Sequence, residues 1–262
     1  MKINQVQEII KAIDEIGFVV IEDVYSEQQM TDAIEEIESK IDWYENLQAE
    51  NGLGTISANS AHHITIMCPT TLALLNPNPT NEILNTFFGG NYILNTMGVS
   101  ICQPQEGYNY TMEIHRDIRS FSSSNRLYIN GVILLDDSTV DNGATHMIKK
   151  EHNIAEKPSD EYFDANSVRI EAKRGDVILF DGNMWHKAGI NHTSKPRRII
   201  SQMFTKPFIK QQLDYPRAFG NDFQYRISDE LKQILGYNAR TPSNLDEFYK
   251  PREKRFYKSD QG

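Results

Sequence analysis

The chain has 262 residues, 39% of them hydrophobic and 10% aromatic, which is enough to build a sizeable core and argues against global disorder. Its formal charge of −9 disfavours a nucleic-acid partner, because phosphates require a basic face. The two cysteines, Cys68 and Cys102, cannot form a disulfide framework, so a reducing, cytoplasmic location is expected. No signal-peptide core follows Met1 and no apolar run is as long as a membrane span, so no membrane partner is expected. The composition does not indicate an oligomeric state.

The first predicted elements are a helix, a short strand and a second helix. Apolar residues at three- and four-residue spacing predict an amphipathic helix over 3–16, which Gly17 ends. An apolar run at 18–21 predicts a short buried strand. Ser26 is a typical N-cap for the second helix, which is expected to fade near Asn46.

The stretch over 51–79 is rich in Gly, Ser, Asn and Pro and predicts an irregular surface segment. Two adjacent histidines, His62 and His63, lie within it. Neighbouring side chains point in different directions, which disfavours a shared metal role. The pair could instead line a substrate cavity.

Short β-rich runs separated by turn residues begin at Tyr92. Clusters of Asp, Asn and Gly punctuate these runs, and no βαβ alternation or glycine-rich nucleotide motif appears. Seven or eight short strands at this spacing predict a β-sandwich or jelly roll. The predicted strands cover 97–103, 108–114, 127–135, 144–149, 168–172, 177–180 and 199–205.

The chain closes with a predicted helix at about 222–237 and a polar tail beyond Ala239, which we expect to be loosely held. No internal repeat or low-complexity linker divides the sequence. We therefore predict one domain over 1–262 that is mainly β with flanking helices. It would comprise N-terminal helices at about 3–48 and a jelly-roll core at about 92–208, followed by the closing helix and tail.

A His-x-Asp triplet in the β-rich region offers two metal-ligating side chains. If 113–117 lies at the end of a strand, His115 and Asp117 point to the same side. A second imidazole, His186, follows a tight turn and a buried strand at 174–182. Two histidines and one carboxylate form a facial triad that suits Fe(II) and leaves positions open for a co-substrate and oxygen. The triplet alone is weak support, because chance supplies one roughly half the time in a chain of this composition.

A possible anchor for that co-substrate lies eleven residues after His186, at Arg197. Its planar guanidinium matches a carboxylate and could hold the far end of a 2-oxo dicarboxylate whose near end chelates the iron. Arg198 is the alternative anchor, although on a strand it faces the other way. Thr145 and Asn130 lie on predicted strands that could face the same site and help to hold 2-oxoglutarate.

These motifs resemble the phytanoyl-CoA dioxygenase family over about residues 5–210. The matching stretches are 17–21 with the helix after it, 141–145, 174–189, Asn191 and 196–198. The resemblance implies a double-stranded β-helix fold that uses Fe(II), 2-oxoglutarate and O2. It also implies the site residues, with His115, Asp117 and His186 as catalytic iron ligands and Arg197 as the 2-oxoglutarate anchor.

The resemblance implies an enzyme that hydroxylates a C–H bond and releases succinate and CO2. We expect its substrate to be a small polar metabolite or natural-product intermediate. The carboxylate of Asp117 disfavours the related halogenases, which carry a small residue there. Where the family often has Pro-Gly-Ser-His, this chain has Lys-Lys-Glu-His at 149–152, which leaves the role of that turn open. Desaturation, epimerisation or ring closure at the same iron, or a non-catalytic jelly roll that binds a ligand, are the alternatives.

Other residues near the motifs have less specific expectations. Trp185 is expected to pack, the pair Asp136 and Asp137 to form a turn, and His146 and His152 either to support the ligands or to be exposed. The loop over 116–125 could act as a lid or recognition element. Further residues that could line the mouth of the site or lie in this loop are Tyr108, Tyr110, Arg119 and Phe121.

Overall fold

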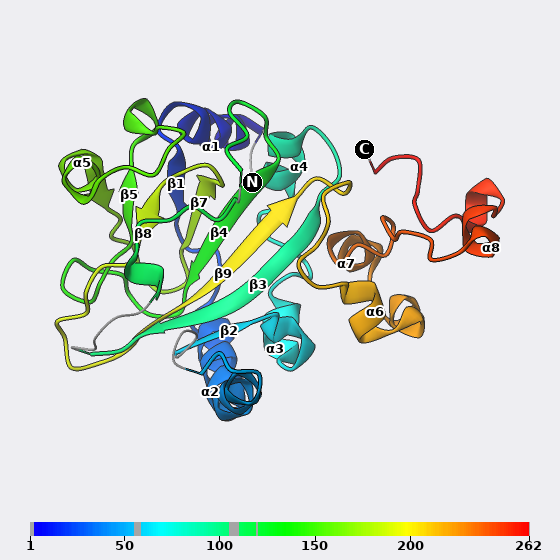
Figure 1. The fold of residues 1–262 in the computed structure, drawn as a ribbon, viewed down its shortest axis with the longest axis horizontal. Coiled ribbons are helices and arrows are strands. Elements are labelled where there is room, and N and C mark those ends of the chain that lie inside the picture. Colours follow the sequence, from blue (N-terminus) through cyan, green and yellow to red (C-terminus); the bar gives the residue numbers. More distant parts are fainter. Residues whose placement is uncertain (1–2, 55–58, 105–109, 119, 262) are drawn as a thin grey trace.

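The computed structural model describes residues 3–54, 59–104, 110–118 and 120–261. Its centre is a six-stranded antiparallel sheet, and a smaller three-stranded antiparallel sheet accompanies it (Figure 1). In order across the large sheet the strands are β1 (Phe18–Ile21), β7 (Val177–Asp181), β4 (Tyr128–Leu134), β9 (Arg197–Thr205), β3 (Ile93–Cys102) and β2 (Ser60–His62). The small sheet has the order β6 (Ser167–Arg169), β5 (His146–Ile148) and β8 (His186–Lys187).

Side chains of the large sheet alternate between two apolar cores. Ile133 and Leu179 point to one face and join the larger core. Ile178 and Phe180 point to the other face, where they pack with Met147 of the small sheet. The two sheets therefore form a sandwich, and this antiparallel arrangement with flanking helices confirms the predicted jelly-roll fold class.

Most of the helices cover the face of the large sheet that carries the larger core. The helices that contribute to this core are α1 (Ile3–Glu15), α2 (Glu27–Glu50), α3 (Pro69–Ala73), α4 (Asn81–Phe88), α6 (Tyr215–Phe219) and α7 (Asp229–Ile234). Ser26 caps α2 as predicted and forms a capping box with Gln29, so the helix has a fixed start. Helix α5 (Asp160–Asn166) packs Phe163 into the smaller core on the opposite face, and α8 (Leu245–Phe248) contributes to neither core. The rest of the opposite face is left for the small sheet and for the candidate site.

Some predicted elements differ from those in the structure. The predicted strand over 108–114 is not seen in the described part of this segment, where Tyr110–Met112 is a 3₁₀ turn and 105–109 lie outside the described residues. The closing helix is shorter than predicted because Ser228 caps a new helix, α7, after the 3₁₀ turn Asn221–Arg226. Helix α2 extends past Asn46 to Glu50. Among the described residues, no helix is long and apolar enough to cross a membrane.

The turn before β7 depends on a glycine, and we predict that Gly175→Ala destabilises the fold strongly. Gly175 has φ +87°, and a Cβ there would lie 2.4 Å from the backbone oxygen of Tyr25. Strain and clash together should lower the free energy of unfolding by about 3 kcal/mol or more. Denaturant unfolding followed by circular dichroism measures this change.

The matched control is Gly52→Ala. Gly52 has a similar φ of +80°, but nothing lies within 4 Å of its Cβ position. This variant should show only the cost of backbone strain, about 1–2 kcal/mol. Equal losses in the two variants would show that the close approach to Tyr25 is unimportant.

Candidate metal centre and active site

Two backbone hydrogen bonds bring the two predicted ligand histidines together. The N–H of His115 donates to the oxygen of His186 over 3.0 Å, and the N–H of His186 donates to the oxygen of His115 over 2.9 Å. This isolated antiparallel bridge replaces the strand that we expected around His115. It leaves the imidazole rings with centroids 4.3 Å apart.

The geometry of His115, Asp117 and His186 is suitable for a metal ion. Their ligand atoms all lie within 4.8 Å of one another. The Nε2 atom of His115 is 3.7 Å from Oδ1 of Asp117, and that of His186 is 3.7 Å from Oδ2. One metal ion could therefore contact all three side chains, and two imidazoles with one carboxylate are a donor set that suits Fe(II).

Both histidines are oriented in the same way. The Nδ1 atom of His115 donates to the oxygen of Glu113 over 2.8 Å, and that of His186 donates to the oxygen of Met184 over 3.0 Å. A carbonyl oxygen can only accept, so the proton of each neutral ring is on Nδ1 and the lone pair is on Nε2. Burial, and secondarily the neighbouring His115, lower the pKa of His186. The ring of His186 is thus held neutral with its lone pair directed at the site.

Asn130 supports the carboxylate of the triad. It lies on β4, and its Nδ2 donates to Oδ2 of Asp117. The sequence predicted Asn130 as a 2-oxoglutarate contact, whereas in the structure its side chain lies against Asp117. Carboxylates that bind metals are often held by such a hydrogen bond, which sets their orientation.

The triad lies in a cavity of about 190 Å³ between the large sheet and β8. The residues that line it include the triad, Thr145, Arg197, Cys102, Ser100, His62, Thr96, Ser201, Met203 and Gln212. Thr145 was predicted to face this site, and it does. The side chains from β9 follow the alternation of a strand, since Arg197, Ile199, Ser201 and Met203 all line the cavity.

Arg197 is a buried cation with an unused donor. Its side chain is only 2% exposed, and its Nε donates to the oxygen of Asn142 over 3.2 Å. Its Nη1 is buried without a hydrogen-bond partner among the described residues. Burial lowers the pKa of Arg197, but a guanidinium stays protonated in proteins. A buried charge with a free donor is costly unless an anion pairs with it, so this end of the cavity is suited to a carboxylate.

The neighbouring Arg198 points to the other face of the sheet. It makes a two-pronged contact with Asp136, through Nε at 2.8 Å and Nη2 at 2.9 Å, and it also pairs with Glu38. The carboxylate of Asp136 raises the pKa of Arg198. Its charge is therefore already paired away from the cavity.

The two adjacent histidines, His62 and His63, have different surroundings in the structure. His62 lines the cavity as expected, and its ring lies over Gly98 of β3, where a Cβ would be 3.6 Å from the imidazole. Burial lowers the pKa of His62, although the charge of Asp117 opposes this shift. His63 instead contacts the hydroxyl of Tyr215 through Nδ1 at 3.0 Å and does not line the cavity.

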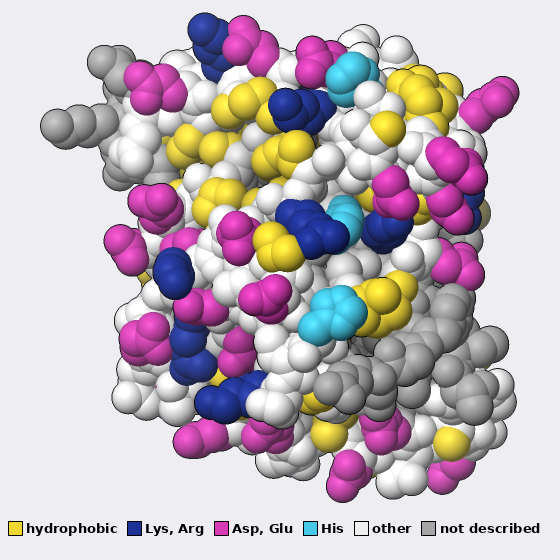
Figure 2. Space-filling view, turned by 90° about the vertical axis from the view of Figure 1, so that its left-hand side faces the viewer, with side chains coloured by type: hydrophobic (Ala, Val, Ile, Leu, Met, Phe, Trp, Pro, Cys, Tyr) yellow, Lys and Arg dark blue, Asp and Glu magenta, His cyan; other side chains and the backbone are white. Residues whose placement is uncertain are grey.

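Several other predicted residues lie away from the cavity. Trp185 packs as expected, with its indole N–H donating to the oxygen of Ile154 over 2.7 Å and Arg116 over its ring. His146 lines a separate hollow of about 640 Å³ beside β8. Figure 2 shows the side of the molecule that lies at the left of Figure 1, where basic, acidic and histidine side chains are intermingled. The side chain of His152 pairs with Glu151.

The loop over 116–125, which the sequence suggested as a lid or recognition element, packs against the rest of the protein. Ser122 in this loop donates to Oδ1 of Asn183 over 2.8 Å, and Phe121 lies under the guanidinium of Arg116. Of the described residues in 116–125, Asp117 alone lines the cavity. Tyr108 and Arg119, and the side chain of Tyr110, lie outside the described part of the chain.

Several residues that line the cavity were not identified as site residues from the sequence, among them Thr96, Ser201, Met203 and Gln212. The period-two pattern that starts at Arg197 could have identified Ser201 and Met203. Gln212 follows β9 in a loop, and its backbone N–H donates to the oxygen of Asn95 over 3.2 Å, so no sequence pattern marks it. Thr96 follows an irregularity in the register of β3 at Asn95.

A family model described as phytanoyl-CoA dioxygenase (PhyH) matches residues 13–199, which is more than half of the chain. The chain belongs to this family. This membership agrees with the resemblance that the sequence motifs carried and with the metal-binding geometry of His115, Asp117 and His186.

Curated relatives and solved structures agree with this membership. "Uncharacterized protein Rv1501" of Mycobacterium tuberculosis is 36% identical over 148 residues, which are 56% of this chain and 54% of that protein, so the match spans about half of the relative's length. "Dioxygenase andF" of Emericella variicolor is 24% identical and covers 95% of this chain and 90% of its own.

Two solved structures share the fold. The α-ketoglutarate-dependent epimerase SnoN from nogalamycin biosynthesis has a TM-score of 0.61 at 14% identity, covering 78% of this chain and 84% of its own. EctD from S. alaskensis, solved with 2-oxoglutarate and 5-hydroxyectoine, has a TM-score of 0.60 at 18% identity, covering 78% and 76%. At these identities the likeness establishes the fold.

We predict that Asn130→Ala weakens metal binding without unfolding the protein. Loss of the hydrogen bond to Asp117 should lower the affinity for Fe(II) about tenfold, because the carboxylate is no longer held in place. Anaerobic titration calorimetry with Fe(II) measures the affinity. The control is Asn95→Ala, which removes another buried asparagine, one that donates to the oxygen of Lys210. The prediction fails if both variants bind the metal equally well.

Proposed function

We propose that this protein hydroxylates a C–H bond of a small polar metabolite or natural-product intermediate, using 2-oxoglutarate and O2 and releasing succinate and CO2. One observation carries the proposal. The same cavity contains three side chains suited to Fe(II) and, at its inner end, a buried guanidinium with a free donor. A dicarboxylate that chelates a metal at one end and binds Arg197 at the other fits that pairing.

In this proposal His115, Asp117 and His186 hold the iron. When bound, Fe(II) and 2-oxoglutarate supply the oxidation of a C–H bond by O2, coupled to loss of CO2. The carbonyls of Glu113 and Met184 fix the orientation of the two imidazoles, and Asn130 holds the carboxylate. The triad with its carboxylate present disfavours halogenation and a non-catalytic binding role.

Arg197 is the proposed 2-oxoglutarate anchor, and the hydroxyl of Thr145 lines the same cavity. Arg198 cannot serve without losing its contacts with Asp136 and Glu38. Arg197 is therefore assigned as the anchor because its guanidinium faces the cavity and that of Arg198 does not.

The substrate would occupy the part of the cavity that lies beyond the metal ligands. Ser201 is exposed there although it lies in a central strand, because its partners across the sheet are Gly98 and Val132. The nearby groups are the imidazole of His62, the hydroxyl of Thr96 and the amide of Gln212. These are hydrogen-bonding groups that carry no full charge, so they favour a substrate with hydroxyl or amide groups over a strongly charged one.

The Asp117→Ala variant tests the iron site directly. The wild type should form a weak visible charge-transfer band with Fe(II) and 2-oxoglutarate under anaerobic conditions and should release succinate when O2 is admitted. The variant should lose both, because the metal loses its anionic ligand. A wild-type protein that shows no band would contradict the proposal whatever the substrate is.

The pair Arg197→Met and Arg198→Met tests the anchor. Removing the buried guanidinium should weaken binding of 2-oxoglutarate about 100-fold, because a charge-assisted contact with a carboxylate contributes about 3 kcal/mol. Arg198→Met should leave that affinity within about threefold and should lower stability instead, since it breaks the pair with Asp136. Titration of the charge-transfer band with 2-oxoglutarate gives both affinities. The reverse ranking would make Arg198 the anchor.

A further inference from the structure

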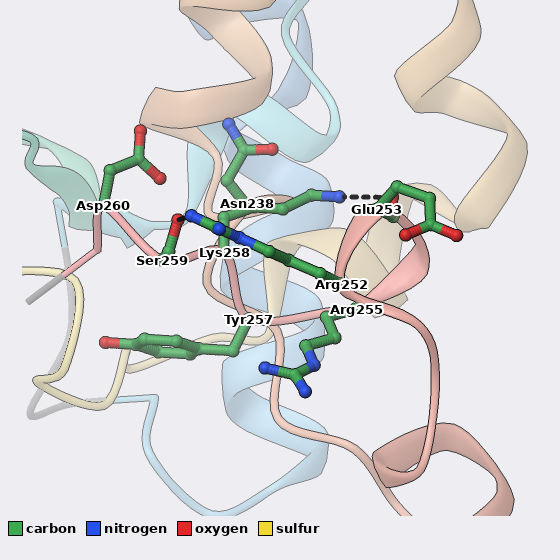
Figure 3. Close-up of a pocket in the computed structure, with 8 residues that line it drawn as sticks. All are labelled: Asn238, Arg252, Glu253, Arg255, Tyr257, Lys258, Ser259 and Asp260. Atoms are coloured by element: carbon green, nitrogen blue, oxygen red, sulfur yellow. Dashed lines mark hydrogen bonds between the residues drawn. The ribbon is translucent and has the colours of Figure 1, made fainter.

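The C-terminal part of the chain forms an arm, which we define as residues 240–256. Both ends of the arm are tied to the body by the bridge between Ala239 and Tyr257 and by the N–H of Lys258, which donates to the oxygen of Asn238 over 2.9 Å. Figure 3 shows two side chains crossing its base, Arg252 donating to Ser259 and Lys258 donating to the backbone of Glu253. In Figure 1 the arm places α8 at one end of the molecule, beyond α6 and α7.

The tip of the arm is an apolar cluster in water. Leu245 and Phe248 are three residues apart on one side of α8, and Tyr249, which follows the helix, packs its ring against that of Phe248. Their exposed fractions are 71%, 60% and 76%. Scattered apolar residues on a surface need no explanation, but three adjacent large ones on a projecting helix are typical of an interaction surface.

Basic side chains follow this tip along the arm. The arm contains five basic residues and three acidic residues, two of which lie in α8, in a chain whose formal charge is −9. Lys250, Arg252, Lys254 and Arg255 are all exposed. A partner for the arm should therefore present apolar side chains among carboxylates.

Helix α2 has a surface of that kind. It carries eight acidic residues and one basic residue. Its core side is formed by residues such as Met30 and Ile37, yet Trp43 and Leu47, four residues apart, are 46% and 42% exposed. Leu53, which is 47% exposed, follows at the end of the helix, where its N–H donates to the oxygen of Gln48 over 2.8 Å. This second apolar side of α2 is not used by the core.

Exposed carboxylates lie beside the apolar side of α2. Asp42 precedes Trp43, and Glu50 is three residues after Leu47 on the same side of the helix. An apolar centre with a charged rim is the usual arrangement of a protein interface. The arm and α2 thus have matching apolar centres and opposite charges.

We propose that the arm docks on α2 of a second copy of this chain. In Figure 1, α2 lies along the lower edge of the molecule and α8 at its right-hand end, so the arm of one chain does not cover its own α2. In a symmetric dimer each copy contributes its arm to the other, which gives two identical contacts and closes the assembly. The surfaces involved are Leu245, Phe248, Tyr249 and the basic residues of the arm, against Trp43, Leu47, Leu53 and the acidic residues of α2.

Sedimentation velocity on the full-length protein tests the apolar contact. The wild type should be a dimer at micromolar concentration, and the combined variant Leu245→Ser, Phe248→Ser, Tyr249→Ser should weaken the dimer by more than about tenfold. The control Ile190→Ser removes another exposed apolar residue, which is outside both surfaces and is 55% exposed, and should leave the dimer unchanged. A wild type that stays monomeric at about 100 µM overturns the proposal.

Exchange of charges identifies the partner surface. The arm variant Lys250→Glu, Lys254→Glu and the α2 variant Asp42→Lys, Glu50→Lys should each be monomeric alone, because like charges then face each other. An equimolar mixture should dimerise again, since each arm then meets an α2 of opposite charge in both contacts. A mixture that stays monomeric, or single variants that still dimerise, overturns the docking of the arm on α2. Recovery in the mixture also shows that the variants are folded.

Discussion

The reciprocal backbone hydrogen bonds between His115 and His186 are the constraint on which the candidate site depends. They join two segments that are distant in the chain and place two imidazoles side by side without a continuous strand. Each ring is then turned in the same way, by donation from Nδ1 to the carbonyl of the residue two positions earlier. Because backbone groups set both the position and the orientation, the site requires little from the side chains around it beyond a neutral setting and Asn130 to hold the carboxylate.

The asymmetry of the sandwich explains why the cavity is where it is. Most of the helices cover one face of the large sheet, where they pack into the larger apolar core. On the other face the small sheet covers only part of the area, and small residues such as Gly98 and Ser201 leave the remainder hollow. Adjacent residues of β9 point to opposite faces of the sheet, so Arg197 faces the hollow and Arg198 pairs with Asp136 on the other face. One strand thus supplies a buried guanidinium that faces the cavity and a structural ion pair from adjacent positions.

The features predicted correctly from the sequence are those that depend on patterns extending over many residues. The strand at 18–21, the first two helices and the jelly-roll class follow from periodicity and turn residues, and the joint occurrence of His115, Asp117 and His186 followed from motif spacing. The sequence could not predict β8 or β2, because strands of two or three residues carry no periodic signal. The sequence also could not show whether Asn130 donates to Asp117 or to a bound ligand. Both contacts require a polar side chain on the same face of β4. Contacts made through a loop, as by Gln212, are set by tertiary structure alone.

The cavity is lined by residues from inside and from outside the family match. The match covers residues 13–199, which include the three candidate ligands and Arg197. Gln212 lies beyond it, and it lines both the cavity and a larger hollow of about 980 Å³ whose other walls come mostly from the segment after β9. The hydrogen bonds of Asn95 hold this segment, through Lys210 and Gln212, against the start of β3. The candidate ligands and Arg197 therefore all lie within the family match, whereas the walls proposed for the substrate combine residues inside the match, such as His62 and Thr96, with Ser201 and Gln212 outside it.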